Sequence, residues 1–340
     1  MNCEIKLTPK TFHFKQPAGT SRGVYAERKV WFLELCDEDG NVGVGECAPL
    51  PNLSCDYDFI ASHDNEYLVH LIRQANWIGG NLLSFPSLRF ALETAMLSLQ
   101  ARGNANLGFD TPFARGEAGI LTNGLIWMGD FATMKTRIHE KLDAGFHCLK
   151  LKIGAIGFDE ELSLLKSVRD EFDAGTVILR VDANGAFSAD EAMEKLKRLA
   201  ELDLHSIEQP IRAGQSDAMA ELCAGTPLPI ALDEELIGIN MPVKKRRLIE
   251  KIKPQFIVLK PSLHGGMAGC KQWAEFAEKN GAGWWITSAL ESNVGLNAIA
   301  QWTASMLGGN AFPQGLGTGT LFADNIESSL EMRGEQLWAK

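Results

Sequence analysis

Charged residues that could carry acid–base or metal chemistry recur at nearly even spacing through the middle of the 340-residue chain. Each of them ends a short apolar run, and successive groups lie 25 to 30 residues apart. Carboxylate oxygens suit a hard cation such as Mg²⁺, and a partly desolvated lysine can act as a general base. The pattern therefore indicates a metal site with lysines around it. The residues are Lys150 with Lys152, Asp182, Glu208, Asp233 with Glu234, and Lys260.

Each of these residues also has an ordinary structural interpretation. Asp182 (in RVDANG) and Glu208 (in SIEQP) could lie in turns or loops, and Asp233 (in ALDEEL) could cap a helix. Lys150 and Lys152 alternate along LKLKIG, as protective lysines on an exposed edge strand do. A central strand makes unpaired lysines costly, so the set as a whole favours the functional interpretation.

An alternation of short apolar runs with amphipathic segments would position these residues. The amphipathic segments cover 158–171, 189–201, 271–279 and 294–306, and they predict helices. Strands that alternate with helices indicate parallel βαβ units, and eight of them favour a closed barrel over an open, doubly wound sheet. In a barrel the ends of the strands meet at one mouth, where active sites lie. The runs are Leu125–Met128, Cys148–Ile153, Val177–Val181, His205–Ile207, Pro229–Leu232, Phe256–Leu259, Gly283–Thr287 and a weak last one, Gln314–Gly317.

The segment before the barrel reads as α+β. Strands are predicted over Glu4–Phe14, Lys29–Cys36 and Asn41–Glu46, and Asp37–Gly40 is predicted to be the hairpin turn of the first two strands or one close to it. Apolar spacing predicts a helix over Pro86–Ala101. The predicted domains are residues 1–118, residues 119–317 as the barrel, and a tail, 318–340, that packs back on the first domain.

Composition excludes several other classes of protein. A formal net charge of −10 disfavours a nucleic-acid partner, and no apolar run is long enough to cross a membrane. The seven cysteines include no C-x-x-C pair, and the N-terminus has no apolar signal segment, so a reducing, cytoplasmic location is expected. Neither a P-loop nor a dinucleotide-binding glycine motif occurs. Nothing in the sequence fixes an oligomeric state.

Five short motifs in order resemble the enolase superfamily, and within it the muconate-lactonizing subgroup. The G-E-x-A-P-L and S-A-L-E-S-N-V-G segments, Gly45–Leu50 and Ser288–Gly295, also look like this family. The resemblance implies a (β/α)7β TIM-like barrel with an α+β N-terminal capping domain that the C-terminal tail completes. The motifs are K-x-K (Lys150–Lys152), D-x-N (Asp182–Asn184), E-x-P (Glu208–Pro210), D-E (Asp233–Glu234) and K-P (Lys260–Pro261).

The resemblance also implies a role for each residue at the strand ends. Lys152 and Lys260 would be opposed acid/base groups, and Lys150 would favour the neutral amine of Lys152 as a nearby like charge. Arg180 shares the inward face of Asp182 and is a candidate partner of the carboxylates, with a plain structural ion pair as the alternative. The remaining roles are Asp182, Glu208 and Asp233 as ligands of Mg²⁺, or of Mn²⁺ in its place, and Asn184 and Glu234 as groups that orient them.

The residues at the end of the eighth predicted strand indicate which enzymes of the subgroup this chain resembles. Dipeptide epimerases usually carry D-x-D there, whereas Gly315–Thr320 has no carboxylate. The G-L-G-T-G ending resembles the o-succinylbenzoate synthases, hydro-lyases of menaquinone biosynthesis that act on a small carboxylate by syn dehydration. The alternatives are a dipeptide epimerase, an N-acylamino acid racemase or a cycloisomerase of the subgroup, and a non-enzymatic relative.

Contacts to the substrate are predicted in loops around the mouth of the barrel. The loops Gly19–Arg22 and Pro49–Ser54 would meet the far end of the substrate, so Arg22 is a candidate. Ser288 could donate a hydrogen bond. Gly265 could bring a backbone N–H to a carboxylate, with a simple turn before the next helix as the alternative.

Overall fold

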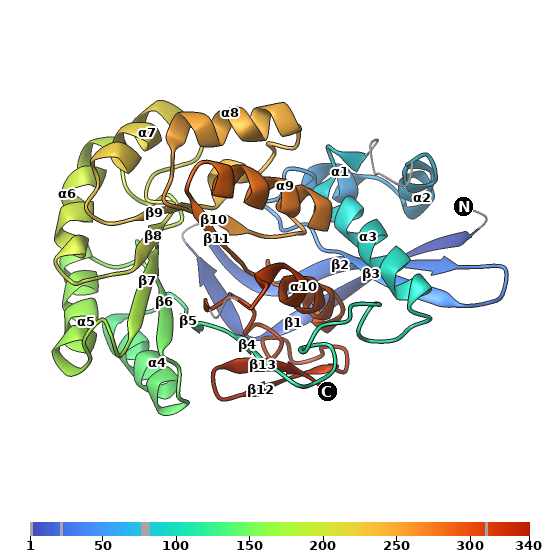
Figure 1. Ribbon diagram of the computed structural model, residues 1–340, viewed down its shortest axis with the longest axis horizontal. Helices are drawn as coiled ribbons and strands as arrows, with labels where there is room; N and C mark the ends of the chain where they lie inside the picture. Colours follow the sequence, from blue (N-terminus) through green and yellow to red (C-terminus); the bar gives the residue numbers. More distant parts are fainter. Residues whose placement is uncertain (1–2, 21–22, 76–81, 310–311) are drawn as a thin grey trace.

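Seven parallel strands form the central sheet, in the order β11-β10-β9-β8-β7-β6-β5. The computed structural model describes residues 3–20, 23–75, 82–309 and 312–340, and Figure 1 shows these strands curving round a common centre. Strand β6 is buried over its whole length, as expected for a parallel strand covered on both faces. The strands are β5 (Gly124–Ile126), β6 (Cys148–Lys152), β7 (Ile178–Asp182), β8 (Ser206–Glu208), β9 (Ile230–Leu232), β10 (Phe256–Leu259) and β11 (Gly283–Ile286).

Two isolated parallel bridges complete the ring where the weak eighth run was predicted. Gln314 pairs with Thr122, just before β5, and Gly315 pairs with Thr287, just after β11. A Cβ atom on Gly315 would lie 2.2 Å from Thr287 Oγ1, so glycine allows the two backbones to approach this closely. The predicted barrel is therefore confirmed over the open doubly wound sheet, with its last strand reduced to these bridges.

Amphipathic helices cover the outside of the strands (Figure 1). In α6 the buried side chains are Ala192, Leu196 and Leu199, which share one helical face. Within the described residues, no helix is both long and apolar enough to span a lipid bilayer. The barrel helices are α4 (Phe131–Asp143), α5 (Phe158–Glu171), α6 (Ala189–Ala200), α7 (Ser216–Gly225), α8 (Pro242–Ile252), α9 (Gly266–Lys279) and α10 (Asn293–Leu307), with a short 3-10 helix, η2 (Glu234–Leu236).

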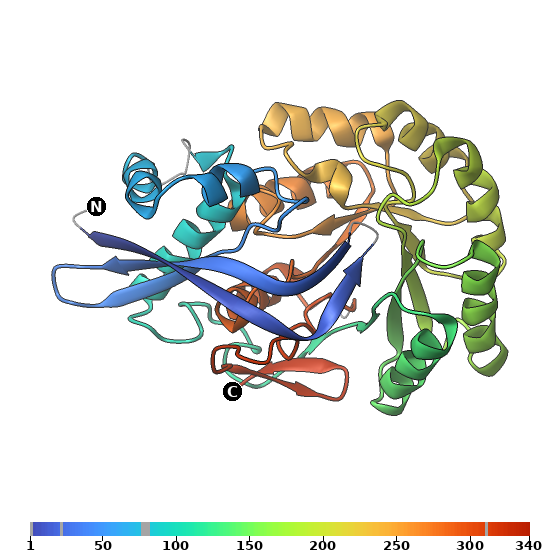
Figure 2. The same cartoon turned by 180° about the vertical axis from the view of Figure 1, so that it is seen from behind.

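The N-terminal domain is an antiparallel sheet with helices packed beside it, and Figure 2 shows that sheet in front of the barrel. The turn Asp37–Gly40 joins the second strand to the third, with Asp37 N–H donating to Asn41 O at 3.1 Å. Of the two predicted alternatives, a turn between the first two strands or a turn close to it, the second is correct, since this turn follows β2 and precedes β3. The elements are β1 (Glu4–Thr20), β2 (Gly23–Cys36), β3 (Val42–Cys47), α1 (Tyr57–Ser62), α2 (Asn65–Arg73) and α3 (Pro86–Gln100).

Strand β3 lies unusually close to helix α3, and glycine makes this possible. A Cβ atom on Gly45 would fall 1.9 Å from Ala91 O, and one on Gly43 would fall 2.2 Å from Ala95 O. The glycine of the G-E-x-A-P-L motif therefore serves packing, since any side chain there would push the helix off the sheet.

The same strand ties the N-terminal domain to the barrel. The buried Glu46 carboxylate accepts hydrogen bonds from the backbone N–H groups of Ser292 and Gly295, both at 2.8 Å, at the start of α10. The buried Arg28 guanidinium donates to the carbonyl oxygens of Ala289 and Leu290. These contacts fix the loop after β11, and with it one wall of the barrel mouth.

Replacement of Glu46 by glutamine is expected to flatten the pH dependence of stability. Burial raises the pKa of Glu46 to about 7, although hydrogen bonds from Ser292 oppose the shift. Because the folded state holds this proton more tightly, the free energy of unfolding should fall as pH rises from about 4.5 to 7, by at most about 3 kcal/mol.

Urea unfolding at pH 5, 6, 7 and 8 measures this slope. The Glu46→Gln variant should show a smaller decrease than the wild type over pH 5–7. A surface variant on an exposed part of α7, Glu221→Gln, should keep the wild-type slope. An unchanged slope in Glu46→Gln would show that another group is responsible.

The tail after the barrel contacts the N-terminal domain along β1. Ala323 N–H donates to His13 O at 2.8 Å, and the Phe322 ring packs on Phe12 and Phe14. Its hairpin, β12 (Leu330–Arg333) and β13 (Gln336–Ala339), pairs with β4 (Ile120–Leu121) in a separate antiparallel sheet. The boundaries predicted after residues 118 and 317 stay a prediction.

Candidate active site

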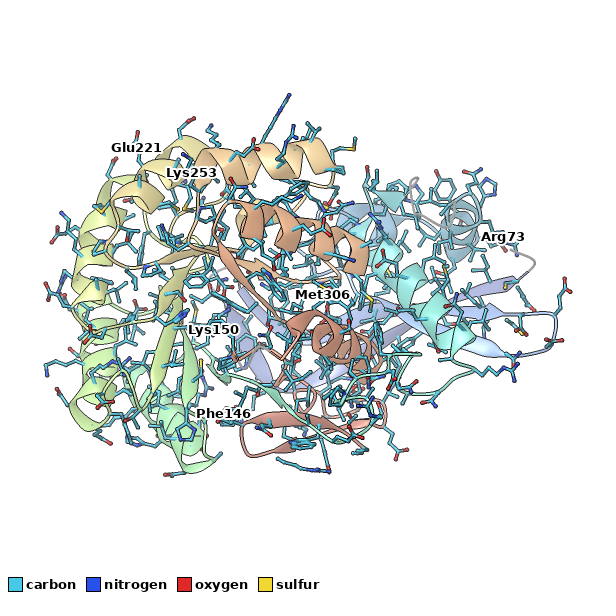
Figure 3. All side chains as sticks on the ribbon, viewed as in Figure 1. Arg73, Phe146, Lys150, Glu221, Lys253 and Met306 are labelled. Atoms are coloured by element: carbon cyan, nitrogen blue, oxygen red, sulfur yellow. The ribbon has the colours of Figure 1, made fainter. Side chains whose placement is uncertain are left out.

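Lys150 and Lys152 project into the barrel from the end of β6. Figure 3 places Lys150 among the barrel strands, whereas Glu221 and Arg73 lie at the periphery. Alternation along the strand puts both lysines on the inward face, and both are buried. These lysines are central and paired with carboxylates, so the edge-strand interpretation does not hold for them.

Asp182, at the end of the neighbouring β7, is the shared partner of the two lysines. Its Oδ2 atom accepts from Lys150 Nζ at 2.8 Å and from Lys152 Nζ at 2.5 Å. Burial alone would raise the pKa of Asp182, but the two ammonium groups hold that pKa well below its usual value. Asp182 is therefore an ionised carboxylate in the interior of the barrel.

Lys150 also forms an ion pair with Glu208, at the end of β8. Its two carboxylate partners, Asp182 and Glu208, keep the amine of Lys150 charged. Burial lowers the pKa of Lys150, but Asp182 and Glu208 together raise it above its usual value. Lys150 is thus held as an ammonium between two strands.

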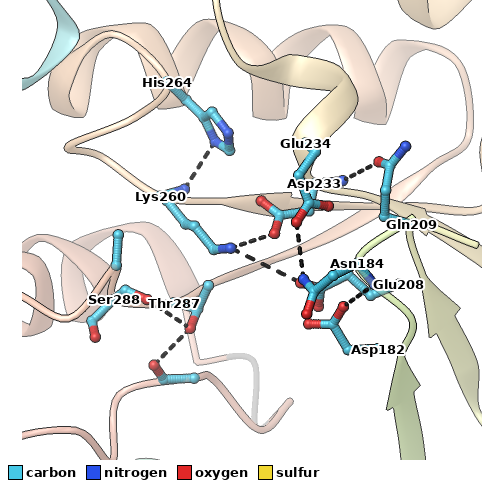
Figure 4. Close-up of polar contacts among 12 residues, drawn as sticks. Asp182, Asn184, Glu208, Gln209, Asp233, Glu234, Lys260, His264, Thr287 and Ser288 are labelled. Carbon is cyan, nitrogen blue, oxygen red and sulfur yellow. Dashed lines mark hydrogen bonds and ion pairs between the residues drawn. The ribbon is translucent and has the colours of Figure 1, made fainter. Parts of the chain in front are cut away.

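Lys260 enters the same space from β10, which is separated from β6 by three strands. Its Nζ atom binds Asp233, at the end of β9, and lies 4.0 Å from Glu208 Oε1 (Figure 4). Burial lowers the pKa of Lys260, but Asp233 and Glu208 raise it to a net value above the usual one. Its backbone N–H donates to His264 Nδ1 at 3.0 Å, which fixes the loop behind it.

The three carboxylates are crowded and not fully satisfied by the protein. Burial, followed by the charges of Asp182 and Asp233, raises the pKa of Glu208 well above its usual value. Glu208 Oε1 and Asp233 Oδ1 are buried without a hydrogen-bond partner. Carboxylate oxygens at the ends of three successive strands, two of them unpartnered, have the chemistry of a site for a hard divalent cation. Within the described residues no three acidic, cysteine or histidine side chains are already grouped as a metal site, because the ammonium groups lie between the carboxylates.

Asn184 and Glu234 extend from Lys152 in a chain of hydrogen bonds. Lys152 Nζ donates to Asn184 Oδ1 at 3.0 Å, and Asn184 Nδ2 donates to Glu234 Oε1 at 2.9 Å. Asn184 adopts a left-handed backbone with φ 45°, which turns its side chain back toward the lysine. The geometry places both residues beside the lysine and the carboxylates, where the sequence expected them.

Arg180 does not have the partner expected for it. Its Nη1 atom donates to Pro313 O at 2.9 Å, and its guanidinium stacks on Trp285 and Phe312. Among the described residues it forms no ion pair with a carboxylate. Strand alternation predicted its inward direction correctly, but Trp285 on β11 and Phe312 in a loop hold the guanidinium away from the carboxylates, and burial lowers its pKa.

The geometry does not support Gly265 as a substrate contact, whereas the prediction for Arg22 is not tested. Gly265 is buried at the start of α9 with φ 94°, where it forms the turn before the helix, as the alternative interpretation had it. It does not line the cavity at the barrel mouth. Arg22 lies outside the described residues.

A cavity at the barrel mouth contains the lysines and opens toward the N-terminal domain. Ser288 lines it, and the hydroxyl groups of Ser288 and Thr318 lie 2.6 Å apart. Thr318 was missed by sequence reasoning, although the glycine-rich ending that contains it was noted. The apolar wall comprises Tyr25, Leu50, Leu53, Leu125, Trp127 and Leu290, of which Leu50 and Leu53 fall in the predicted loop Pro49–Ser54.

Comparison with known proteins agrees with this geometry. Residues 133–336 match the family described as enolase C-terminal domain-like. The chain is 46% identical to an o-succinylbenzoate synthase of Desulfotalea psychrophila, over 97% of each protein. The chain belongs to the o-succinylbenzoate synthase family of the enolase superfamily. The crystal structure of MenC from the same organism superposes on this o-succinylbenzoate synthase family member with a TM-score of 0.83, 41% identity and coverage of 99% of both chains.

More distant relatives share the fold of the o-succinylbenzoate synthase family. The L-Ala-D/L-Glu epimerase of Bacillus subtilis has a TM-score of 0.82 at 19% identity, and it covers 99% of this chain. At that identity the likeness shows the fold alone, so it does not favour the epimerase alternative. The family assignment also removes the non-enzymatic alternative, since the family consists of hydro-lyases.

Proposed function

We propose that this protein dehydrates 2-succinyl-6-hydroxy-2,4-cyclohexadiene-1-carboxylate to 2-succinylbenzoate, with Lys152 as the base. The observation that carries the proposal is the convergence of two opposed lysines and three carboxylates at one barrel mouth, in a member of this family. The cavity holds three lysines, and Glu234 is the carboxylate among its described lining residues, which suits a small anionic substrate.

Asp182, Glu208 and Asp233 would hold Mg²⁺, since enolase-superfamily enzymes generally depend on that ion. The unsatisfied oxygens of Glu208 and Asp233 support this assignment. When bound, the cation supplies positive charge that stabilises the substrate carboxylate as negative charge builds up on it. Mn²⁺, with the same preference for oxygen ligands, would serve as a substitute.

Lys152 would take the proton from the carbon next to the ring carboxylate and pass it to the departing hydroxyl group. The C–H and C–O bonds break, a ring C=C bond forms, and the hydroxyl leaves as water. One group on one face can do both steps because the elimination is syn. Asp182 Oδ2 accepts a hydrogen bond from Lys152 in this structure. If Asp182 held the metal ion instead, the amine of Lys152 would be free to react.

Lys260 would act as a fixed cation on the opposite side of the substrate. Its pKa is raised by Asp233 and Glu208, which outweigh the effect of burial, so the side chain stays an ammonium at neutral pH. A buried ammonium stabilises an anion well because the surrounding medium is of low dielectric constant. A racemase would instead need Lys260 to exchange protons.

The far end of the substrate would contact the wall that includes Ser288 and Thr318. Their paired hydroxyl groups can donate to a carboxylate, and Trp127 and Leu290 flank them with apolar surface. We also infer a cytoplasmic location, because the cysteines of the described chain are free thiols.

The test is to incubate the purified protein with Mg²⁺ and the cyclohexadiene carboxylate, and to follow the loss of ultraviolet absorbance on aromatisation. Turnover should require Mg²⁺ and stop when the metal is removed with EDTA. Folded protein that binds Mg²⁺ but does not consume this substrate would overturn the proposal. Deuterium exchange at the α-carbon of N-succinyl amino acids would then test the racemase alternative.

A further inference from the structure

Gln209 lies directly after Glu208, and its side chain spans two neighbouring strand ends. The residue is fully buried, and its backbone adopts a left-handed conformation with φ 40°, which is unusual for a residue other than glycine. Backbone bonds hold that conformation, with Gln209 N–H donating to Ala231 O at 2.9 Å and Gly185 N–H donating to Gln209 O at 2.7 Å. The fold therefore maintains a strained residue beside a proposed metal ligand.

The amide of Gln209 reaches the backbone that carries the next proposed ligand. Its Oε1 atom accepts from the backbone N–H groups of Asp233 and Glu235, both at 3.2 Å. Its Nε2 atom donates to Ile211 O at 3.0 Å and lies 3.3 Å from Glu235 Oε2. Both ends of the amide are thus satisfied in a buried position, which fixes the orientation of the side chain.

Glu235 extends this link to the following loop. Its carboxylate accepts from the backbone N–H of Gly214 at 3.1 Å and is itself buried. Gln209 and Glu235 together therefore hold the end of β8, the start of η2 and the loop at Gly214 as one unit. Figure 4 shows Gln209 beside Asp233, with Lys260 on the other side of the carboxylates.

The structure assigns Gln209 as a positioning residue that sets the distance between Glu208 and Asp233, and so the affinity of the site for a divalent cation. This assignment rests on the proposed metal site. The carboxylate of Asp233 has one described partner, Lys260, and an Oδ1 atom with none. The backbone hydrogen bond from Asp233 N–H to Gln209 Oε1 therefore holds this ligand from the side opposite Lys260.

The test is to measure Mn²⁺ and Mg²⁺ binding by calorimetry in the Gln209→Met variant. Methionine keeps the length of the side chain and loses its hydrogen bonds. Affinity should fall by about 10- to 100-fold, the usual loss when a residue that orients metal ligands is removed. The double variant Gln209→Glu/Glu235→Gln exchanges amide and carboxyl groups, keeps an acceptor for the N–H groups of Asp233 and Glu235, and should recover most of the affinity.

Gln255 offers a matched control at the opposite end of the barrel strands. Its Oε1 atom accepts from Ile230 N–H at 2.9 Å, and its Nε2 atom donates to Cys223 O at 3.0 Å. Gln255→Met should lower the thermal stability as Gln209→Met does, but leave metal affinity unchanged. Equal affinity in Gln209→Met and wild type, or equal losses in the two Met variants, would overturn the assignment. A wild-type protein that binds no divalent cation would instead refute the proposed metal site.

Discussion

Replacement of Lys152 by alanine is expected to lower kcat for dehydration by about 10²–10⁴-fold, the usual contribution of a positioned general acid–base group. The amine of Lys152 would handle both the abstracted proton and the departing hydroxyl, so no other step can compensate for its loss. The KM for the substrate should change much less, because the proposed metal ligands Asp182, Glu208 and Asp233 are retained. Lys152→Arg should be as inactive as the alanine variant, since a guanidinium stays protonated at neutral pH.

Stopped-flow or steady-state absorbance measures these rates, and circular dichroism checks the fold. Lys195, which pairs with Glu191 on the outer helix α6, provides a control lysine whose alanine variant should retain wild-type kcat. A Lys152→Ala protein with more than one tenth of the wild-type kcat would rule out Lys152 as the base.

The exchange of Asp182 for asparagine should destabilise the metal-free protein by about 3–5 kcal/mol, the usual cost when one partner of a buried ion pair is removed. Asp182 is fully buried, and its Oδ2 atom accepts from two ammonium groups. An amide cannot balance those charges, so Lys152 would lose its carboxylate partner and Lys150 would keep only Glu208. Divalent-cation binding should be lost as well.

Urea unfolding at pH 7 gives the change in free energy, and the surface ion pair of Asp170 with Lys166 provides the comparison. That pair has the same 2.5 Å separation, but both side chains are about 60% exposed, so Asp170→Asn should cost less than about 1 kcal/mol. A similarly small decrease in the free energy of unfolding in both variants would mean that Asp182 does not balance the charges of the buried lysines.

The carboxylates of the same site should make the folded protein less stable at acidic pH. The pKa values of Asp182 and Asp233 are lowered in the folded state, mainly by the lysines, which outweigh burial. The stability that these carboxylates contribute is therefore present above about pH 4 and is lost as pH falls through their folded-state pKa values. The two aspartates therefore lower the free energy of unfolding as the solution becomes acidic. Glu46 has the opposite effect, since its contribution falls as pH rises from about 4.5 to 7.

The strand ends could be predicted because a barrel repeats its unit at a regular interval. Lys152, Asp182, Glu208, Asp233 and Lys260 each follow an apolar run, and the parallel sheet brings those ends to one mouth. The inward direction of Lys150 followed from alternation alone. The position of a side chain at a strand end, and the face of the sheet to which it points, depend only on the strand itself, so both can be predicted from the sequence.

Partners of the side chains were much harder to predict, because they depend on elements distant in the sequence. Arg180 was correctly placed on the inward face, but its partners Trp285 and Pro313 lie more than a hundred residues later in the sequence. Thr318 joins Ser288 through the closing bridges of the barrel, which carry little strand signal. Gln209 reads as an ordinary residue before a proline, and only its backbone conformation reveals the reach of its amide.

The hairpin near the end of the chain determines when folding can be completed. Strand β13 pairs with β4, and Thr122 bonds to the carbonyl of Glu335, 213 residues away. Contacts that join such distant segments form slowly, because a long loop must close before they give any stabilisation. The N-terminal domain and the first βα units leave the ribosome long before that partner exists. We therefore expect β4 in nascent chains to remain unpaired, and accessible to chaperones or proteases, until β13 has been synthesised.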